Sequence, residues 1–215
     1  MIADDPDGAQ ERAEDWARHG GADSAARCGA LADVALGDPE AGARALDAAS
    51  HEAALPAPRR ALLAAEASRA WLLASRPDRA LESSGLAATL DRSPDYRIDH
   101  ARAALAAHQP ELAIADLSPL LTGPPLRADA LIVRATALRE AGAFERARAD
   151  IDAACQLRPD DPDALLERGI LRERTGDLDG ARDDWSRVIA ASPDTHEADL
   201  AQQDLALLEA GPEAR

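Results

Sequence analysis

The fold is decided by two neighbouring stretches of sequence, ADALIVRATALREAGAFERARADIDAACQLRPDD (residues 128–161) and PDALLERGILRERTGDLDGARDDWSRVIAASPDT (residues 162–195). The two stretches share 10 of their 34 positions, where this biased composition alone would give roughly four. Residues 94–127 share another 10 positions with residues 128–161. Prolines recur at the same 34-residue interval, at Pro125, Pro159 and Pro193. The sequence therefore predicts an array of structural repeats.

Each 34-residue unit has the pattern of two helices joined by a tight turn. Gly142 and Gly176 stand where the first helix must end and the chain must reverse. Asp161 precedes Pro162, which places a capping carboxylate before a proline at the first helical position. Apolar side chains then recur every three or four residues in the second helix of the last unit and predict a buried stripe. They are Leu178, Ala181, Trp185, Val188 and Ile189.

This pattern resembles the tetratricopeptide repeat (TPR) family, whose 34-residue unit has a small residue in its first helix, glycine before its second helix, alanine within it and proline at its end. Residues 162–195 carry these features at Leu165, Gly169, Gly176, Leu178, Ala181, Trp185 and Pro193. Residues 128–161 carry them at Leu131, Ala135, Leu138, Gly142, Phe144, Ala147 and Pro159. The resemblance implies an all-α, right-handed superhelical solenoid of about five TPR-like hairpins with terminal capping helices.

The predicted domain organisation follows this repeat. It comprises an acidic N-terminal segment and helix (1–21), two degenerate hairpins (22–93), three TPR repeats (94–127, 128–161 and 162–195), and a C-terminal capping helix and tail (196–215). Trp16 is expected to anchor the first helix, which should end at Gly20 and Gly21. In the last helix we expect an inward face of Leu200, Leu205, Leu207 and Leu208, and an outward face of Asp199, Gln203 and Asp204.

The composition excludes several classes of protein. The chain has 40 acidic and 24 basic residues, all of the latter arginine, and a net charge of −16. Such a charge disfavours nucleic acid and anionic membranes, because both require a basic face. Alanine (53 residues) and leucine (28) favour helix, and no apolar run is long enough to span a membrane. The absence of lysine and asparagine is typical of a GC-rich, bacterial-type genome.

No motif in the sequence predicts catalysis or the binding of a cofactor or metal. His51-Glu52 and His196-Glu197 begin a zinc-binding HExxH pattern, but leucine occupies the second histidine position in both. Cys28 and Cys155 are far apart and are expected to be small buried side chains. The sequence therefore predicts a protein that is not an enzyme, with no cofactor and no metal.

The resemblance implies that the first helices of the hairpins line a concave groove. Carried over by position, this groove would contain Arg69, Ile98, Arg102, Leu105, Ile132, Thr136, Arg139, Leu166, Ile170 and Arg174. Two interpretations stay open. In one, the arginines pair with neighbouring carboxylates (Glu66, Asp99, Glu140, Glu167 and Glu173). In the other, the apolar and basic lining binds an extended or helical partner segment of acidic and apolar character.

The predicted role is a non-catalytic scaffold that binds a partner protein or peptide in this groove. The alternative is a structural solenoid that assembles with its own copies. A co-chaperone role is not expected, because the family's chaperone-binding branch clamps a carboxylate with asparagine and lysine, and this chain has neither. The acidic start of the chain does not read as a signal peptide. It predicts a cytoplasmic protein if Met1 is the native start, and a periplasmic one if an export signal has been removed.

Overall fold

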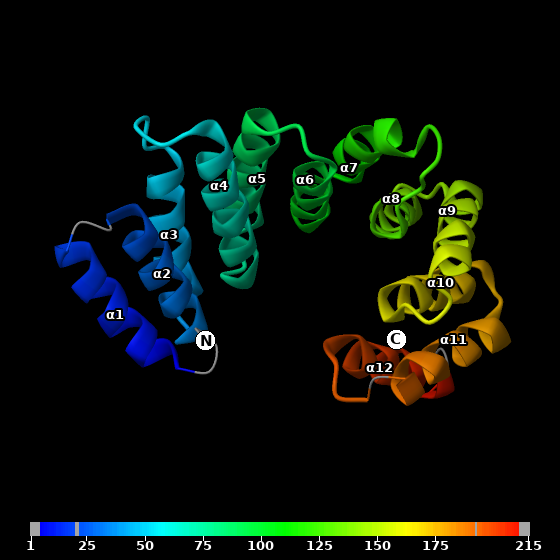
Figure 1. The fold of residues 1–215 in the computed structure, drawn as a ribbon. Coiled ribbons are helices and arrows are strands. Elements are labelled where there is room, and N and C mark those ends of the chain that lie inside the picture. Colours follow the sequence, from blue (N-terminus) through cyan, green and yellow to red (C-terminus); the bar gives the residue numbers. More distant parts are fainter. Residues whose placement is uncertain (1–4, 20–21, 192, 211–215) are drawn as a thin grey trace. The chain divides into compact units, whose positions relative to one another are not determined.

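A computed structural model describes residues 5–19, 22–191 and 193–210. Its described residues form twelve α-helices and one short 3-10 helix, with no strand (Figure 1). The predicted all-α fold is therefore confirmed for this part of the chain. The helices are α1 (Pro6–Arg18), α2 (Ala22–Ala35), α3 (Pro39–Ser50), α4 (Ala57–Leu73), α5 (Pro77–Leu90), α6 (Pro94–Ala106), α7 (Pro110–Leu117), the 3-10 helix η1 (Ser118–Leu121), α8 (Ala128–Glu140), α9 (Phe144–Leu157), α10 (Pro162–Thr175), α11 (Leu178–Ala191) and α12 (His196–Ala210).

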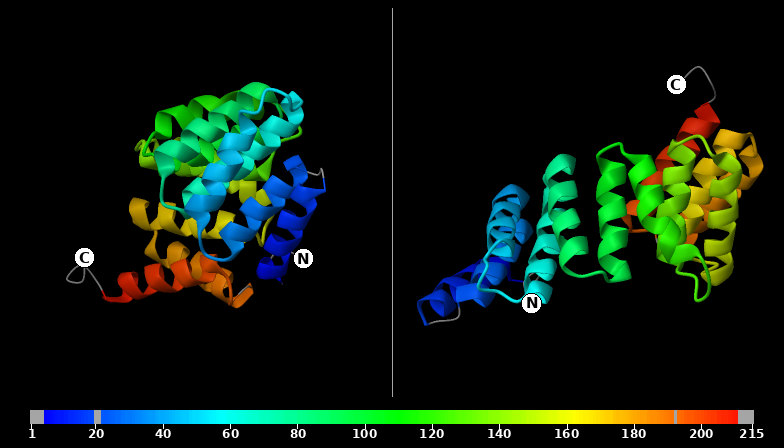
Figure 2. Two further views of the ribbon diagram at one scale, coloured as in Figure 1. Left: turned by 90° about the vertical axis from the view of Figure 1, so that its left-hand side faces the viewer. Right: turned by 90° about the horizontal axis from the view of Figure 1, so that it is seen from above.

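The chain divides into two compact units, an N-terminal unit (Met1–Gln109) and a C-terminal unit (Pro110–Arg215). The division falls between α6 and α7, within the predicted repeat 94–127. Inside each unit, every helix packs against the next one along the chain, as the views in Figures 1 and 2 show. Each unit is therefore a stack of helical hairpins with its own core.

The N-terminal unit builds its core from alanine and a few larger side chains. Leu46 of α3 and Leu63 and Trp71 of α4 are buried together with alanines of α2 to α6. Two of its helices begin with the capping residues that their sequences offer. Asp38 accepts a hydrogen bond from the Ala41 amide, and Ser93 accepts one from the Asp95 amide. The small alanine side chains allow close approach of the helices, but they bury little apolar area per residue.

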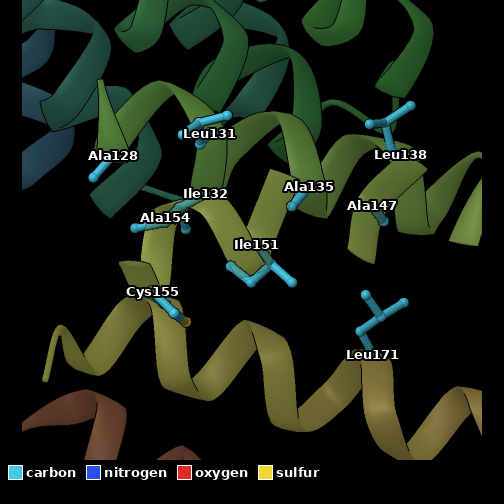
Figure 3. Packing of buried hydrophobic residues seen from close by; sticks show 11 residues of the cluster. Ala128, Leu131, Ile132, Ala135, Leu138, Ala147, Ile151, Ala154, Cys155 and Leu171 are labelled. Atoms are coloured by element: carbon cyan, nitrogen blue, oxygen red, sulfur yellow. The ribbon is translucent and has the colours of Figure 1, made fainter. Parts of the chain in front are cut away.

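The C-terminal unit contains the two hairpins that define the repeat. Gly142 and Gly176 have φ values of +75° and +90°, which is the left-handed conformation that ends a helix most readily at glycine. The core cluster joins α8, α9 and α10 through side chains such as Ile132, Ile151 and Leu171. In Figure 3 the side chain of Cys155 is directed toward α10, from which Leu171 points back into the cluster.

The segment after α7 departs from the regular hairpin. The helix α7 is eight residues long and continues as the 3-10 helix η1. Pro119 lies in η1, and Pro124 and Pro125 follow shortly after it. Proline has no backbone N–H to donate and disfavours helix in the residue before it, so this second helix ends early.

The last helix covers the end of the C-terminal unit, although its faces differ in part from the prediction. Ala198 and Ala201 are its buried residues, and Leu200, Leu205 and Leu208 pack against the cluster around Trp185. The inward placement of Leu207 and the outward placement of Asp204 were wrong, because Leu207 is exposed and Asp204 is half-buried. Part of the contact of α12 with α10 and α11 is made by small alanine side chains, and not every predicted leucine takes part in it.

Two other predicted apolar anchors are also exposed. Trp16 is half exposed and therefore does not anchor α1, and Leu178 stands outside the buried stripe of α11. Both residues lie near helix ends, where a side chain at an apolar position of the pattern no longer faces a neighbouring helix. The predicted helix end at Gly20 and Gly21 lies outside the described residues.

Candidate functional site

In the N-terminal unit, two arginines of successive first helices meet at one carboxylate. Arg69 of α4 donates a hydrogen bond to Asp99 of α6 at 2.6 Å. Arg102, one turn further along α6, donates to the other oxygen of Asp99 at 3.4 Å. The arginine side chains are 60% and 49% exposed, whereas the Asp99 side chain is 11% exposed. Two exposed guanidinium groups thus share a single carboxylate that is itself largely withdrawn from water.

The apolar residues expected beside these arginines lie at different depths. Ile98 is fully buried, so it belongs to the core and is not part of the surface. Leu105, which follows Arg102 by three residues on α6, is half-buried. The described surface here therefore consists of Arg69, Asp99, Arg102 and Leu105, which we call the first-helix face of the N-terminal unit.

In the C-terminal unit, Arg139 is already occupied by a buried partner. It donates to both oxygens of Glu167, at 2.6 and 3.2 Å, and thereby connects α8 to α10. The two side chains are 15% and 8% exposed. Burial raises the pKa of Glu167, even though Arg139 donates hydrogen bonds to it. Arg139 is therefore a structural group between two hairpins, as the charge-pairing interpretation of the sequence would have it.

The remaining predicted groove residues of the C-terminal unit are mostly covered. Ile132 and Leu166 are buried, and the half-buried hydroxyl of Thr136 donates to the carbonyl of Ile132. Ile170 packs into the cluster that α12 also contacts. Arg174 is the exposed residue of this set. The last helix thus packs against the α10 part of this face, at Leu166 and Ile170.

Arg174 borders a cavity beside α12. The cavity has a volume of about 470 Å³ and is lined by Glu173, Arg174, Trp185, Asp204 and Leu207. Burial raises the pKa of Asp204, and the negative charge of Glu173 raises it further. The lining combines two carboxyl groups with one guanidinium, so this cavity is a poor site for an anion.

Two internal ion pairs recur with the repeat and were not predicted from the sequence. Arg134 of α8 donates to both oxygens of Asp150 of α9, at 2.7 and 2.8 Å. Arg168 of α10 makes the same two bonds to Asp184 of α11, at 2.8 and 2.6 Å. The signal was present, because both arginines and both aspartates are identical positions of the 34-residue repeat. These groups lie within the hairpins and hold each first helix against its second helix.

Two kinds of feature are missing from the part of the chain that the structure describes. They contain no group of three or more histidine, cysteine, aspartate or glutamate side chains that could hold a metal ion. Among the helices described, none has both the length and the apolar character needed to cross a membrane. The main feature of the structure is a stack of helical hairpins whose successive first helices carry exposed side chains.

Stacked hairpins of this length and order define the class of helical repeat proteins. Comparison with known families identifies which family of that class the chain resembles. Two family models, both described as tetratricopeptide repeat, match residues 98–162 and 134–206. Together these matches span slightly more than half of the 215 residues. The chain belongs to the tetratricopeptide repeat family. Membership supports a role as a protein-interaction scaffold in general, which is commonly a non-catalytic role.

Solved structures agree with this assignment. MamA (residues 41 to the end) from Desulfovibrio magneticus RS-1 is 19% identical, with a TM-score of 0.62 over 80% of this chain and 97% of that chain. YrrB, described as a TPR protein with an unusual peptide-binding site, is 16% identical, with a TM-score of 0.55 over 83% of this chain and 91% of that chain. At these identities the likeness shows the fold alone. Among curated proteins, no match to this sequence is found.

Proposed function

We propose that this protein is a non-catalytic scaffold that binds an acidic segment of a partner protein on the first-helix face of the N-terminal unit. The observation that carries the proposal is the sharing of Asp99 by Arg69 and Arg102. One carboxylate balances only one of the two guanidinium charges. A partner carboxylate placed between these arginines would balance the other.

The chemistry of arginine suits this partner. A guanidinium group keeps its charge at every physiological pH and offers a planar fork of donors that matches a carboxylate. Leu105 on the same helix supplies a half-buried apolar contact, so a segment that mixes acidic and apolar residues would fit. The net charge of −16 opposes an acidic partner at long range, but screening over about 8 Å at physiological salt leaves the close contacts to decide affinity.

Self-association is the second candidate function. Leu207 is exposed on α12, at the covered end of the C-terminal unit. An exposed leucine on a terminal helix can contact a second copy of the chain. Light scattering over a range of concentrations tests this candidate, and Leu207→Ser should lower the measured mass if α12 mediates the association.

The principal experiment compares two charge-matched double variants. Arg69→Gln with Arg102→Gln removes the proposed site, whereas Arg146→Gln with Arg182→Gln removes two exposed arginines of the C-terminal unit. Proteins that co-purify with the tagged parent from native cells are identified, and the affinity of each purified partner is then measured for all three proteins. The first variant should bind at least about tenfold more weakly, as loss of central interface arginines commonly does. Equal affinities for all three proteins would exclude this face as the binding site.

A further inference from the structure

The cavity beside α12 in the C-terminal unit contains a carboxylate that no described residue pairs with. Its volume of about 470 Å³ is within the range of ligand pockets, and residues of α10, α11 and α12 line it. These three helices pack against one another at the end of the unit (Figure 1). The lining carboxylate of α12, Asp204, forms no hydrogen bond or ion pair within the part of the chain that the structure describes. A half-buried carboxylate without a partner favours any cation that can reach it.

The groups around Asp204 leave this part of the cavity negative. Burial raises the pKa of Asp204, the charge of Glu173 raises it further, and the charge of Arg139 lowers it. Arg139, however, already donates two hydrogen bonds to Glu167. Among the described lining residues Arg174 is the one basic side chain, against the two carboxyl groups of Glu173 and Asp204. The lining can therefore accept a further positive charge.

The helix α12 supplies no strong cation of its own to pair with Asp204. Its sequence, HEADLAQQDLALLEA, contains four carboxylates and neither arginine nor lysine. A second copy of α12 packed against this face would bring like charges together, which is unfavourable at close range. A partner that carries lysine or arginine has the complementary charge. The charges of α12 thus favour a basic partner over a second copy of the chain.

The cavity also offers an apolar wall for the stem of a long basic side chain. Leu207 lines it, is 39% exposed and follows Asp204 by three residues, so the two side chains are neighbours on α12. Trp185 lines it as well, but the indole nitrogen lies against Gly169 of α10 and is not available to a ligand. The methylene groups of lysine and arginine pack along apolar surface while the charged end reaches a polar group.

We infer that this cavity binds a lysine or arginine side chain from a basic segment of a partner protein, at a site separate from the first-helix face of the N-terminal unit. The charged end of that side chain pairs with Asp204, and its stem lies along Leu207. The net charge of −16 attracts such a partner at long range, whereas it opposes an acidic one. Added salt should therefore weaken binding at this cavity.

The test titrates the full chain, labelled with ¹⁵N, with a short peptide that has one lysine between two leucines and is blocked at both ends. The control peptide has glutamine in place of the lysine. The indole N–H signal of Trp185, assigned by comparison with Trp16→Phe and Trp71→Phe, should shift on addition of the lysine peptide, because this ring lines the cavity. The signal of Trp71, which belongs to the N-terminal unit, should not move and serves as an internal reference.

Single variants compare the cavity with an exposed site of the same unit. Asp204→Asn removes the partner of the lysine and should raise the dissociation constant at least about tenfold, as expected for the loss of a hydrogen bond between charged groups. Asp179→Asn removes a carboxylate that is 97% exposed and pairs with Arg182, so the dissociation constant should not change. Leu207→Ser should weaken binding by less than Asp204→Asn does. Circular dichroism confirms that each variant keeps its helices.

The inference is overturned if the Trp185 signal does not move, if the glutamine peptide binds as tightly as the lysine peptide, or if Asp204→Asn binds like the parent. It is also overturned if light scattering finds a dimer that Leu207→Ser separates while the lysine peptide fails to bind, because a second copy then covers α12. These measurements leave Arg69 and Arg102 unchanged, so the first-helix proposal stands or falls by its own experiment.

Discussion

The two units of this protein bury polar side chains of different kinds. Among the residues that the structure describes, the buried polar residues of the N-terminal unit are the serines Ser50, Ser68, Ser83 and Ser84. In the C-terminal unit they are the carboxylates Asp150, Glu167 and Asp184. Hydroxyls can be satisfied by nearby groups, whereas a buried carboxylate needs a cation at a defined place. The charged groups therefore specify which helices pair. Among the serines, Ser83 of α5 donates to Asp47 of α3, whereas Ser50 and Ser84 bond within their own helices.

The hydrogen bonds of these residues support the distinction. The Ser84 hydroxyl donates to the Ala80 carbonyl in its own helix, and this bond would form whichever helix packed beside α5. Asp184, in contrast, accepts hydrogen bonds from Arg168 and Arg172 of the preceding helix. Sequence recognition follows the same division, because the family matches begin at residue 98 and cover mainly the C-terminal unit. Hairpins continue through the N-terminal unit, where Arg27 of α2 pairs with Glu66 of α4 and Arg69 of α4 pairs with Asp99 of α6, so these ion pairs join the first helices of successive hairpins.

The largest expected effect comes from breaking an internal ion pair. Asp184→Ala leaves Arg168 and Arg172 without their carboxylate inside the hairpin, and we expect a loss of about 3–5 kcal/mol in the free energy of unfolding. Ser84→Ala, the corresponding change in the N-terminal unit, should cost about 1 kcal/mol or less. Urea denaturation followed by circular dichroism measures both values.

Two further variants control for this result. Asp179→Ala removes a carboxylate that is 97% exposed and pairs with Arg182, so its effect should be below about 0.5 kcal/mol. Replacing Arg168 and Asp184 together by leucine should restore part of the lost stability, since only Arg172 then loses a partner and it also pairs with Asp177. Similar losses for Asp184→Ala and Ser84→Ala would remove the proposed difference between the units.

The second prediction concerns the end of the C-terminal unit. Ala201→Glu places a charge at a fully buried position of α12 and should release the helix from α10 and α11. We expect a loss of about 2 kcal/mol or more from the exposed leucines and the buried charge. Ala206→Glu, at an exposed position of the same helix, is the matched control. Hydrogen exchange of α12 should rise in the first variant only; unchanged protection would show that α12 does not cap the unit.

A third prediction compares one glycine from each unit. At Gly169 of α10 an added Cβ would lie 2.3 Å from Nε1 of the buried Trp185, whereas at Gly85 of α5 its nearest neighbour would be His100 at 3.5 Å. Gly169→Ala should therefore destabilise by about 1–3 kcal/mol through overpacking. Gly85→Ala should stabilise by about 0.5–1 kcal/mol, because alanine is the better helix former. The same sign in both thermal unfolding experiments would contradict this account of the packing.

The smallest effect concerns pH and the cavity beside α12. Burial raises the pKa of Asp204, with a further contribution from Glu173. The folded state therefore holds this proton more tightly than the unfolded state, and the resulting stability is lost as the pH rises through the folded pKa. Asp204→Asn should raise stability at pH 7 by less than about 1 kcal/mol, because the carboxyl is partly solvated. This gain in stability should vanish below the ordinary pKa of aspartate. A gain that does not change with pH would show that the substitution acts through packing.

The repeat made much of the fold predictable. The interval between the prolines, the turn glycines Gly142 and Gly176, and the Asp161-Pro162 pair indicated the hairpins and their ends, and the helices of the structure follow them. Helix type and hairpin order depend on local pattern, which a single sequence contains. The burial predicted for Trp16 and Leu178 was wrong, because burial near a helix end depends on what the neighbouring helix leaves uncovered.

The candidate site was harder to predict for a related physical reason. Position in the repeat placed Arg69, Arg102 and Arg139 alike on first helices, yet the first two are exposed and the third is buried against Glu167. The difference depends on which carboxylate the next hairpin presents, and the sequence alone left this choice open.

The internal ion pairs also bear on how such a chain lengthens in evolution. Arg134 and Asp150 belong to the same hairpin, α8–α9, so a gene duplication of that hairpin would carry both charges and leave neither alone. The Arg139–Glu167 pair joins two successive hairpins instead. After such a duplication the first Arg139 would face a copy of Val133, which stands 34 residues before Glu167. The array can thus lengthen by whole hairpins. The ion pair between successive hairpins would then have to be restored at each new junction by later mutations.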